Sequence, residues 1–333
     1  GSLGQQSMTA NLLVIGEITP RMHARLTPSF TLHYTDRIDD VAAFLAQEGY
    51  GIAYVLTDGH NGVPRAWMDA LPGLKLIGNY GVGYDAIDVG MTSERGVLVT
   101  HTPGVLSDEV ATTALMLMLA CYRNLLASDA FVRGGIWPEE RHMALSRSAD
   151  HRRVGILGLG RIGLAIAKKL EPFHAKLSYH NRKERDVPYR YCPDLLKMAA
   201  EADVLFVVTP GGLETHGIVD REVIDALGPD GMLVNVSRGS VVDELGLVAA
   251  LEEGRLGAAG LDVFADEPNV PAALFAMENV VLTPHIGSAT EETRQAMGDL
   301  VVDNLLQHQA DGRVISPVPE CRGKSLIVNR LTV

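Results

Sequence analysis

Three side chains in the second half of the chain are of the types that carbonyl reduction requires. Arg238 and His285 each follow a short apolar run, and Glu267 lies in the segment FADEP. An arginine keeps its charge and pairs best with a carboxylate, while a histidine can donate a proton near neutral pH. A neighbouring carboxylate would orient the imidazole and stabilise its protonated form. Each residue alone could be a structural ion pair, a surface histidine or a solvated acid, but together they favour reduction of a keto acid.

The segment HRRVGILGLGRIG at 151–163 predicts a dinucleotide-binding turn. A strand-like run ends at Gly158, which would make the tight turn; Gly160 would let a pyrophosphate approach the backbone, and Gly163 would let the following helix pack closely. The backbone of the intervening Leu159, Arg161 and Ile162 completes the predicted pyrophosphate site at the helix N-terminus. The motif alone leaves a plain strand-to-helix turn open, but a second strand-like run at 175–180 supports the dinucleotide interpretation.

Further cofactor contacts are expected just after the strands of the same region. In an open α/β sheet, ligands bind outside the carboxyl ends of the strands. The residues that this rule selects are Thr209, Pro210, Val236, Ser237, Arg238, Asp262, His285 and Gly287.

The first hundred residues alternate strand and helix signals, which predicts a small parallel α/β unit. Its loop NYGVGYD, at 79–85, follows a predicted strand. Two glycines flank Val82, so the backbone N–H groups of Val82 and Gly83 could hold an anion such as a carboxylate, although a plain turn remains open.

The region after residue 102 predicts a doubly wound sheet, preceded by one long apolar helix over 107–126 that must be buried. A polar stretch follows it and contains Trp137 and Arg141. A last long helix is expected over 291–309, and the tail past Pro317 is expected to be loosely held.

Composition excludes several classes of function. The formal net charge of −12 argues against nucleic acid or an anionic membrane as a partner. The cysteines, three in number, show no metal-ligand spacing, which indicates a reducing, cytoplasmic location and no metal site. The opening GSLGQQS, residues 1–7, looks like a tag remnant before a start at Met8, and the apolar run within 110–122 is too short for a membrane span.

The sequence resembles the D-isomer-specific 2-hydroxyacid dehydrogenase family from about residue 12 to 318. The matching motifs are NYGVGYDAID, TPGVLSDEVATTAL, VGILGLGRIG, VNVSRGSVVDELGLVAALEEGRLGAAGLDVFADEP and VVLTPHIGSAT. Within the family it is most similar to glyoxylate/hydroxypyruvate reductases, including those of the hydroxyphenylpyruvate reductase type.

The resemblance implies two Rossmann-like or flavodoxin-like parallel-sheet domains with an active-site cleft between them. A substrate domain would comprise residues 8–101 and 289–318, and a nucleotide-binding domain residues 102–288. The linear order of elements alone does not predict that the final helix returns to the first domain.

The resemblance also implies the role of each site residue. Arg238 would bind the substrate, Glu267 would partner the histidine, His285 would donate the proton, and Val82 and Gly83 would hold the carboxylate. Members are usually homodimers joined through the nucleotide domain, which would bury the helix over 107–126 and direct Trp137 and Arg141 toward the site of the neighbouring subunit.

One departure from the family concerns the cofactor. Members that prefer NAD end the second nucleotide-domain strand with an acid, whereas this chain has Asn181, Arg182 and Lys183. The resemblance therefore implies NADPH as the preferred cofactor, with NAD possible, for reduction of a small 2-oxo acid to a D-2-hydroxy acid. The two cations could instead be solvated loop residues.

Two alternatives stay open. The same fold serves as a nucleotide-sensing corepressor, and the scaffold also supports other D-2-hydroxyacid specificities as well as formate or phosphite oxidation. Formate enzymes carry a glutamine shortly before the histidine, which NVVLTPHIG lacks.

Overall fold

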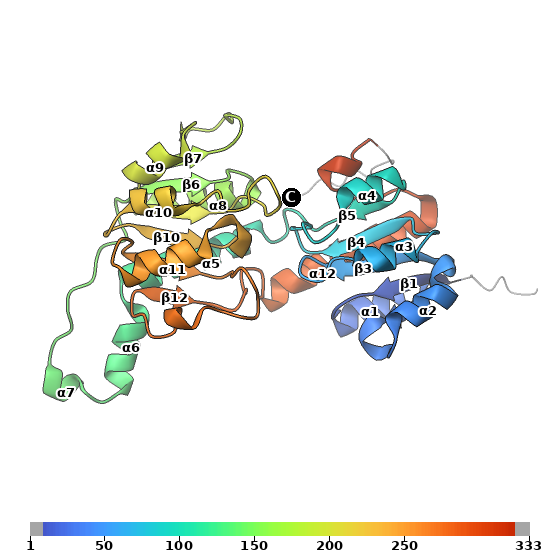
Figure 1. Cartoon of the computed structure of the whole chain (residues 1–333), viewed down its shortest axis with the longest axis horizontal. Helices are drawn as coiled ribbons and strands as arrows, with labels where there is room; N and C mark the ends of the chain where they lie inside the picture. The colour runs from blue at the N-terminus through green and yellow to red at the C-terminus, as the bar shows by residue number, and fades with distance from the viewer. Residues whose placement is uncertain (1–8, 324–333) are drawn as a thin grey trace, which may run out of the picture. The chain divides into compact units, whose positions relative to one another are not determined.

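The computed structural model describes residues 9–323 and divides into two units, each built on a parallel β-sheet (Figure 1). The first unit runs to Leu106 and resumes at Glu291, and the second is continuous from Ser107 to Thr290. The predicted tag remnant at 1–7 lies outside the described residues.

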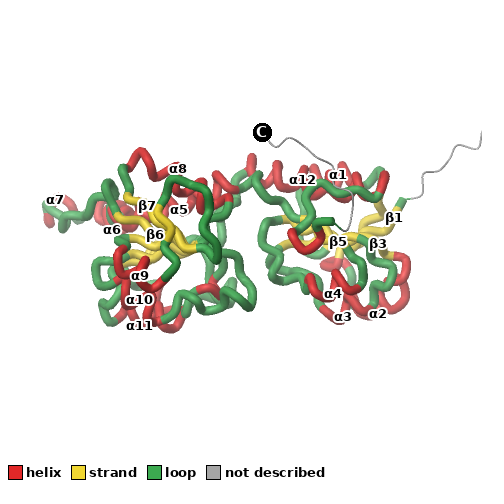
Figure 2. Tube along the Cα trace, turned by 90° about the horizontal axis from the view of Figure 1, so that it is seen from above, coloured by secondary structure: helices red, strands yellow, loops and turns green. Residues whose placement is uncertain are grey.

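The first unit holds a five-stranded sheet in the order β2-β1-β3-β4-β5. Helices α1 and α12 cover one face, and α2, α3 and α4 cover the other (Figure 2). The strands are β1 (Ala10–Val14), β2 (Phe30–Tyr34), β3 (Ile52–Asp58), β4 (Leu76–Tyr80) and β5 (Leu98–Thr100), and the helices are α1 (Pro20–Leu26), α2 (Val41–Glu48), α3 (Arg65–Asp69), α4 (Val89–Glu94) and α12 (Glu291–Asp311).

The long helix α12 closes the first unit although it comes almost last in the chain. It packs on β4 so closely that a Cβ added at Gly78 would lie 3.1 Å from Val301 Cγ2. Arg21 of α1 pairs with Asp299 of α12 at 2.9 Å. The unit is therefore built from two distant segments of the chain.

The second unit holds a seven-stranded sheet in the order β12-β11-β10-β9-β6-β7-β8. Helices α5 and α8 lie on one face and α9, α10 and α11 on the other (Figure 2). The strands are β6 (Arg153–Leu157), β7 (Lys176–His180), β8 (Arg190–Tyr191), β9 (Val204–Val207), β10 (Met232–Asn235), β11 (Ala258–Leu261) and β12 (Val280–Leu282), and the helices are α5 (Ser107–Tyr122), α6 (Leu125–Arg133), α7 (Trp137–Glu140), α8 (Arg161–Leu170), α9 (Leu195–Glu201), α10 (Arg221–Leu227) and α11 (Glu244–Glu252).

Short polar side chains mark where many of these helices begin. Asp220 accepts a hydrogen bond from Val223 N, and Asp243 accepts one from Gly246 N, so each caps the free N–H groups of a helix first turn. Apolar strands alternate with capped helices of this kind, which is the pattern that predicted the parallel α/β fold, and the prediction is confirmed.

Two sequence-based expectations were wrong in detail. The helix expected over 107–126 ends at Tyr122, because Asn124 adopts a left-handed conformation (φ 50°) from which α6 starts in a new direction. The tail past Pro317 is not loosely held up to residue 323, since Val318 N donates to Val99 O and Cys321 is buried. Neither the kink nor this docking against β5 has a local sequence signal.

Among residues 9–323 no single helix is long and apolar enough to cross a membrane. The bent pair α5 and α6 would qualify by length and composition, but the apolar side chains of α5 are largely buried inside the second unit.

Candidate active site

His285 and Glu267 form a direct pair at one edge of the second unit. His285 Nδ1 lies 2.6 Å from Glu267 Oε1, and Glu267 Oε2 accepts a hydrogen bond from Phe264 N at 3.0 Å. Burial acts to raise the pKa of Glu267, but the bonds from His285 and Phe264, with the charge of Arg238, outweigh it and lower the pKa. The carboxylate is therefore ionised at neutral pH, and the imidazole side chain remains 43% exposed.

The backbone of His285 is held by a buried aspartate. His285 is left-handed (φ 52°), and its N–H donates to Asp262 O at 2.9 Å. The Asp262 carboxylate accepts from the N–H groups of Ile286 (2.7 Å) and Gly287 (2.9 Å) and from the Thr283 hydroxyl (2.7 Å). Asp262 and Gly287 were predicted as cofactor contacts, and in the structure they shape the turn that carries the histidine.

Arg238 follows β10 on a turn fixed by Asn235. The buried Asn235 donates to Arg238 O at 3.0 Å and accepts from Ser237 N at 3.0 Å. A Cβ at Gly239 would lie 2.1 Å from the Phe264 carbonyl carbon, so only glycine lets this turn pack against the Glu267 loop. Arg238 is thereby close enough for its charge to act on Glu267. Sequence reasoning missed Asn235, whose signal is a polar residue at the end of a buried strand.

The predicted dinucleotide turn joins β6 to α8. A Cβ at Gly158 (φ 97°) would lie 2.8 Å from the backbone of Thr209, and one at Gly163 would lie 2.4 Å from Gly158 O. A Cβ at Gly160 would meet nothing within 4 Å, and no side chain caps α8. Free N–H groups beside open space fit the pyrophosphate of a dinucleotide.

The end of β7 is tied to this turn. Asn181 Oδ1 accepts from Leu159 N at 2.7 Å, and Arg185 donates to Leu159 O at 2.5 Å. The neighbouring Arg182 forms an ion pair with Glu214, a residue of the loop after β9, and both side chains are more than 70% exposed. No sequence motif predicts these contacts of Arg185 and Glu214.

The predicted carboxylate loop lies in the first unit, where β4 ends. Val82 and Gly83 are partly exposed. Among the described residues, no acceptor takes the N–H group of either residue, which leaves both donors available to an anion.

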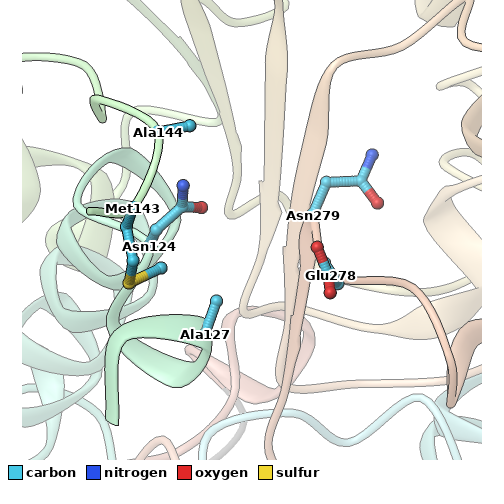
Figure 3. Close-up of a pocket in the computed structure, with 6 residues that line it drawn as sticks. All are labelled: Asn124, Ala127, Met143, Ala144, Glu278 and Asn279. Carbon is cyan, nitrogen blue, oxygen red and sulfur yellow. The ribbon is translucent and has the colours of Figure 1, made fainter. Parts of the chain in front are cut away.

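The predicted substrate contact Trp137 lies on a projecting arm of the second unit formed by α6, α7 and the segment back to β6 (Figure 1). At the base of the arm is a hollow of about 380 Å³ (Figure 3). It is lined by Asn124, Ala127, Met143, Ala144, Glu278 and Asn279, so none of the predicted site residues lines it. Trp137 itself is 56% exposed.

Comparison with known proteins identifies the family. Residues 115–287 match the family described as D-isomer specific 2-hydroxyacid dehydrogenase, NAD binding domain. The chain belongs to the D-isomer specific 2-hydroxyacid dehydrogenase family. The expectation drawn from the sequence motifs is thus confirmed, and the chain is an NAD(P)-binding oxidoreductase of this family.

This dehydrogenase is similar to curated proteins that are named as reductases. It is 46% identical over 276 residues to hydroxyphenylpyruvate reductase of Plectranthus scutellarioides, covering 83% of this chain and 88% of that one. It is 42% identical over 315 residues to 2-ketogluconate reductase of Gluconobacter oxydans, covering 94% and 99%.

A solved structure of a reductase has the same fold as this dehydrogenase. The NADPH-dependent glyoxylate/hydroxypyruvate reductase of Sinorhizobium meliloti, in complex with NADP and malonate, is 43% identical and superimposes with a TM-score of 0.90. The match covers 97% of this dehydrogenase and all of that chain (100%).

Proposed function

We propose that this dehydrogenase uses NADPH to reduce small 2-oxo acids, such as glyoxylate and hydroxypyruvate, to D-2-hydroxy acids. The observation that carries the proposal is the 2.6 Å pair of His285 and Glu267, with Arg238 close enough to act on the same carboxylate. The named activities of the relatives support the substrate class. We assign the first unit, which holds residues 82–83, to the substrate domain. We assign the continuous second unit to the nucleotide-binding domain.

The chemistry divides among these residues. A bound reduced nicotinamide supplies the hydride for the carbonyl carbon. The ring nitrogen of His285 that does not face Glu267 is Nε2, and it donates the proton to the carbonyl oxygen. Arg238 balances the charge of the substrate carboxylate, the N–H groups of Val82 and Gly83 donate hydrogen bonds to it, and ionised Glu267 keeps the imidazolium in one orientation.

Selectivity for NADPH is the second part of the proposal. An acid at the end of β7 would repel a 2′-phosphate, whereas Asn181 is neutral and Arg182 and Lys183 are cationic. The structure of the Sinorhizobium meliloti relative in complex with NADP supports this choice. Asn181 is uncharged and its side chain already accepts from Leu159 N, so the charge that distinguishes the cofactors must come from the two cations.

We also propose a homodimer formed through the arm. Exposed apolar side chains gather on it, namely Leu125, Leu126, Val132, Ile136, Trp137 and Leu145. Monomers rarely expose so many together, and a second copy of the chain is the occupant that the family resemblance implies. Light scattering should give twice the 35.8 kDa chain mass, and Leu126→Asp should reduce it to the monomer mass. A cytoplasmic location stays a prediction.

A substrate panel tests the proposal directly. Steady-state rates with glyoxylate, hydroxypyruvate, phenylpyruvate and 2-ketogluconate, each with NADPH and NADH, should show turnover of 2-oxo acids with NADPH favoured. Chiral analysis of the hydroxypyruvate product should give D-glycerate, and L-glycerate would refute the assigned stereochemistry. Nucleotide binding without any turnover would instead indicate a corepressor, which the relatives' reductase names do not favour.

A further inference from the structure

Three successive carbonyl groups of the carboxylate loop accept hydrogen bonds from the interior of the first unit. Asn79 Nδ2 donates to Gly81 O at 3.1 Å and to Gly83 O at 2.9 Å. His101 Nδ1 donates to Val82 O at 3.0 Å. The side chain of Asn79 is completely buried, with 0% exposure, so these bonds do not compete with solvent.

Because each peptide group is planar, the bonds to these carbonyls also fix the direction of the neighbouring N–H groups. In a trans peptide the C=O of one residue and the N–H of the next point in opposite directions. Because the carbonyls of 81, 82 and 83 face Asn79 and His101, the N–H groups of Val82, Gly83 and Tyr84 point away from them. Within residues 9–323 none of these three N–H groups has an acceptor.

The side-chain amide of Asn79 is suited to binding two carbonyl groups because it has two N–H donors. A primary amide has two N–H bonds and no charge, so it can hold two carbonyls at once. An aspartate of the same shape has no donor when ionised and would repel both carbonyls. Its charge would also oppose an anion on the far side of the loop. Thr102 N adds a bond to Gly81 O at 3.0 Å, which fixes the start of the loop.

We propose that Asn79 and His101 are positioning residues for the substrate carboxylate, and that the Tyr84 N–H is a third donor beside those of Val82 and Gly83. Neither side chain touches the substrate; each acts by holding peptide groups so that their N–H dipoles converge on one anion. The inference rests on the proposed function, because it assumes that the loop receives the carboxylate of a 2-oxo acid.

The test separates a loss of carboxylate recognition from a general loss of catalytic activity. Glyoxylate and its neutral amide are compared as substrates of Asn79→Ala, His101→Ala and His101→Asn, the last of which keeps a side-chain N–H donor. Loss of bonds that orient donors to a charged group should lower kcat/KM for glyoxylate about 10–100-fold in the alanine variants. The amide should be affected far less, and His101→Asn should regain part of the preference for the acid.

Two readouts report binding rather than the chemical step. The inhibition constant of oxalate should rise with the KM of glyoxylate. The dissociation constant of NADPH, measured by fluorescence, should stay within about twofold of wild type, because the predicted nucleotide contacts belong to the second unit. Asn79 is buried, so Asn79→Ala is first checked for folding by circular dichroism. If that variant does not fold, the comparison of His101→Ala with His101→Asn is sufficient to test the proposal.

The outcomes distinguish this inference from the proposed function. A wild-type enzyme that does not prefer glyoxylate over its amide would overturn the proposed function. A wild-type enzyme with that preference, whose alanine variants keep it unchanged or lose activity equally on both substrates, would overturn only the positioning roles.

Discussion

Glu267 receives two hydrogen bonds that together fix its position, one from the ring of His285 and one from its own loop at Phe264 N. The carboxylate therefore stays in place whether or not the imidazole is protonated. A fixed acceptor of this kind leaves the histidine one orientation in which to donate, which is the relationship that a proton donor needs.

His285→Ala should lower kcat about 10²–10⁴-fold, because the variant loses a proton donor that acts in the transition state. NADPH binding should fall far less than kcat, because His285 is only one of several predicted cofactor contacts. Single-turnover kinetics with glyoxylate measures the chemical step itself. Turnover near that of wild type would show that His285 is not the proton donor.

Glu267→Gln should move the alkaline limb of the pH profile for reduction to lower pH. The pKa of Glu267 lies below its ordinary value, so wild type has a negative charge beside the ring throughout the neutral range. Without that charge the protonated imidazole loses its partner, and the proton donor disappears at lower pH. The measurement is kcat/KM for glyoxylate between about pH 5 and 10, and an unshifted limb would assign Glu267 a purely structural role.

Arg182→Ala should lower kcat/KM with NADPH tenfold or more and leave NADH nearly unchanged, since only NADPH presents a 2′-phosphate. Glu214→Gln should change NADPH use in the opposite direction, by up to about fivefold, because the exposed ion pair that competes for Arg182 is removed. Equal use of the two cofactors by wild type would mean that the 2′-phosphate is not recognised here.

Gly160→Ala and Gly163→Ala should separate binding from stability. A Cβ at Gly160 meets nothing within 4 Å, so the variant should fold normally but bind NADPH at least tenfold more weakly, with the methyl group in the path of the pyrophosphate. A Cβ at Gly163 lies 2.4 Å from Gly158 O, so that variant should lose about 1–3 kcal/mol of stability. Calorimetry and NADPH titration of both variants check this, and a destabilised Gly160→Ala would contradict it.

The sequence predicted which side chains form the site better than it predicted the contacts that position those side chains. Arg238 and His285 could be found because each lies within three residues of the end of a strand, and strand ends gather at one sheet edge. The fixing of His285 by Asp262 and of Arg238 by Asn235 could not be found, because a buried polar residue has the same local signal whether it binds a ligand or a backbone. The break at Asn124 was not predicted although asparagine adopts the left-handed conformation more readily than most residues, because Leu125 and Leu126 continue the apolar pattern past it.

The return of α12 to the first sheet sets an order on biosynthesis. Every residue of the second unit leaves the ribosome before Val301, which packs against Gly78 of β4. The second unit can thus fold while translation continues, whereas the sheet made first must wait for its covering helix until the whole second unit has been made. During that interval the apolar face over β4 is uncovered, and it is the surface that a chaperone would have to protect in the nascent chain.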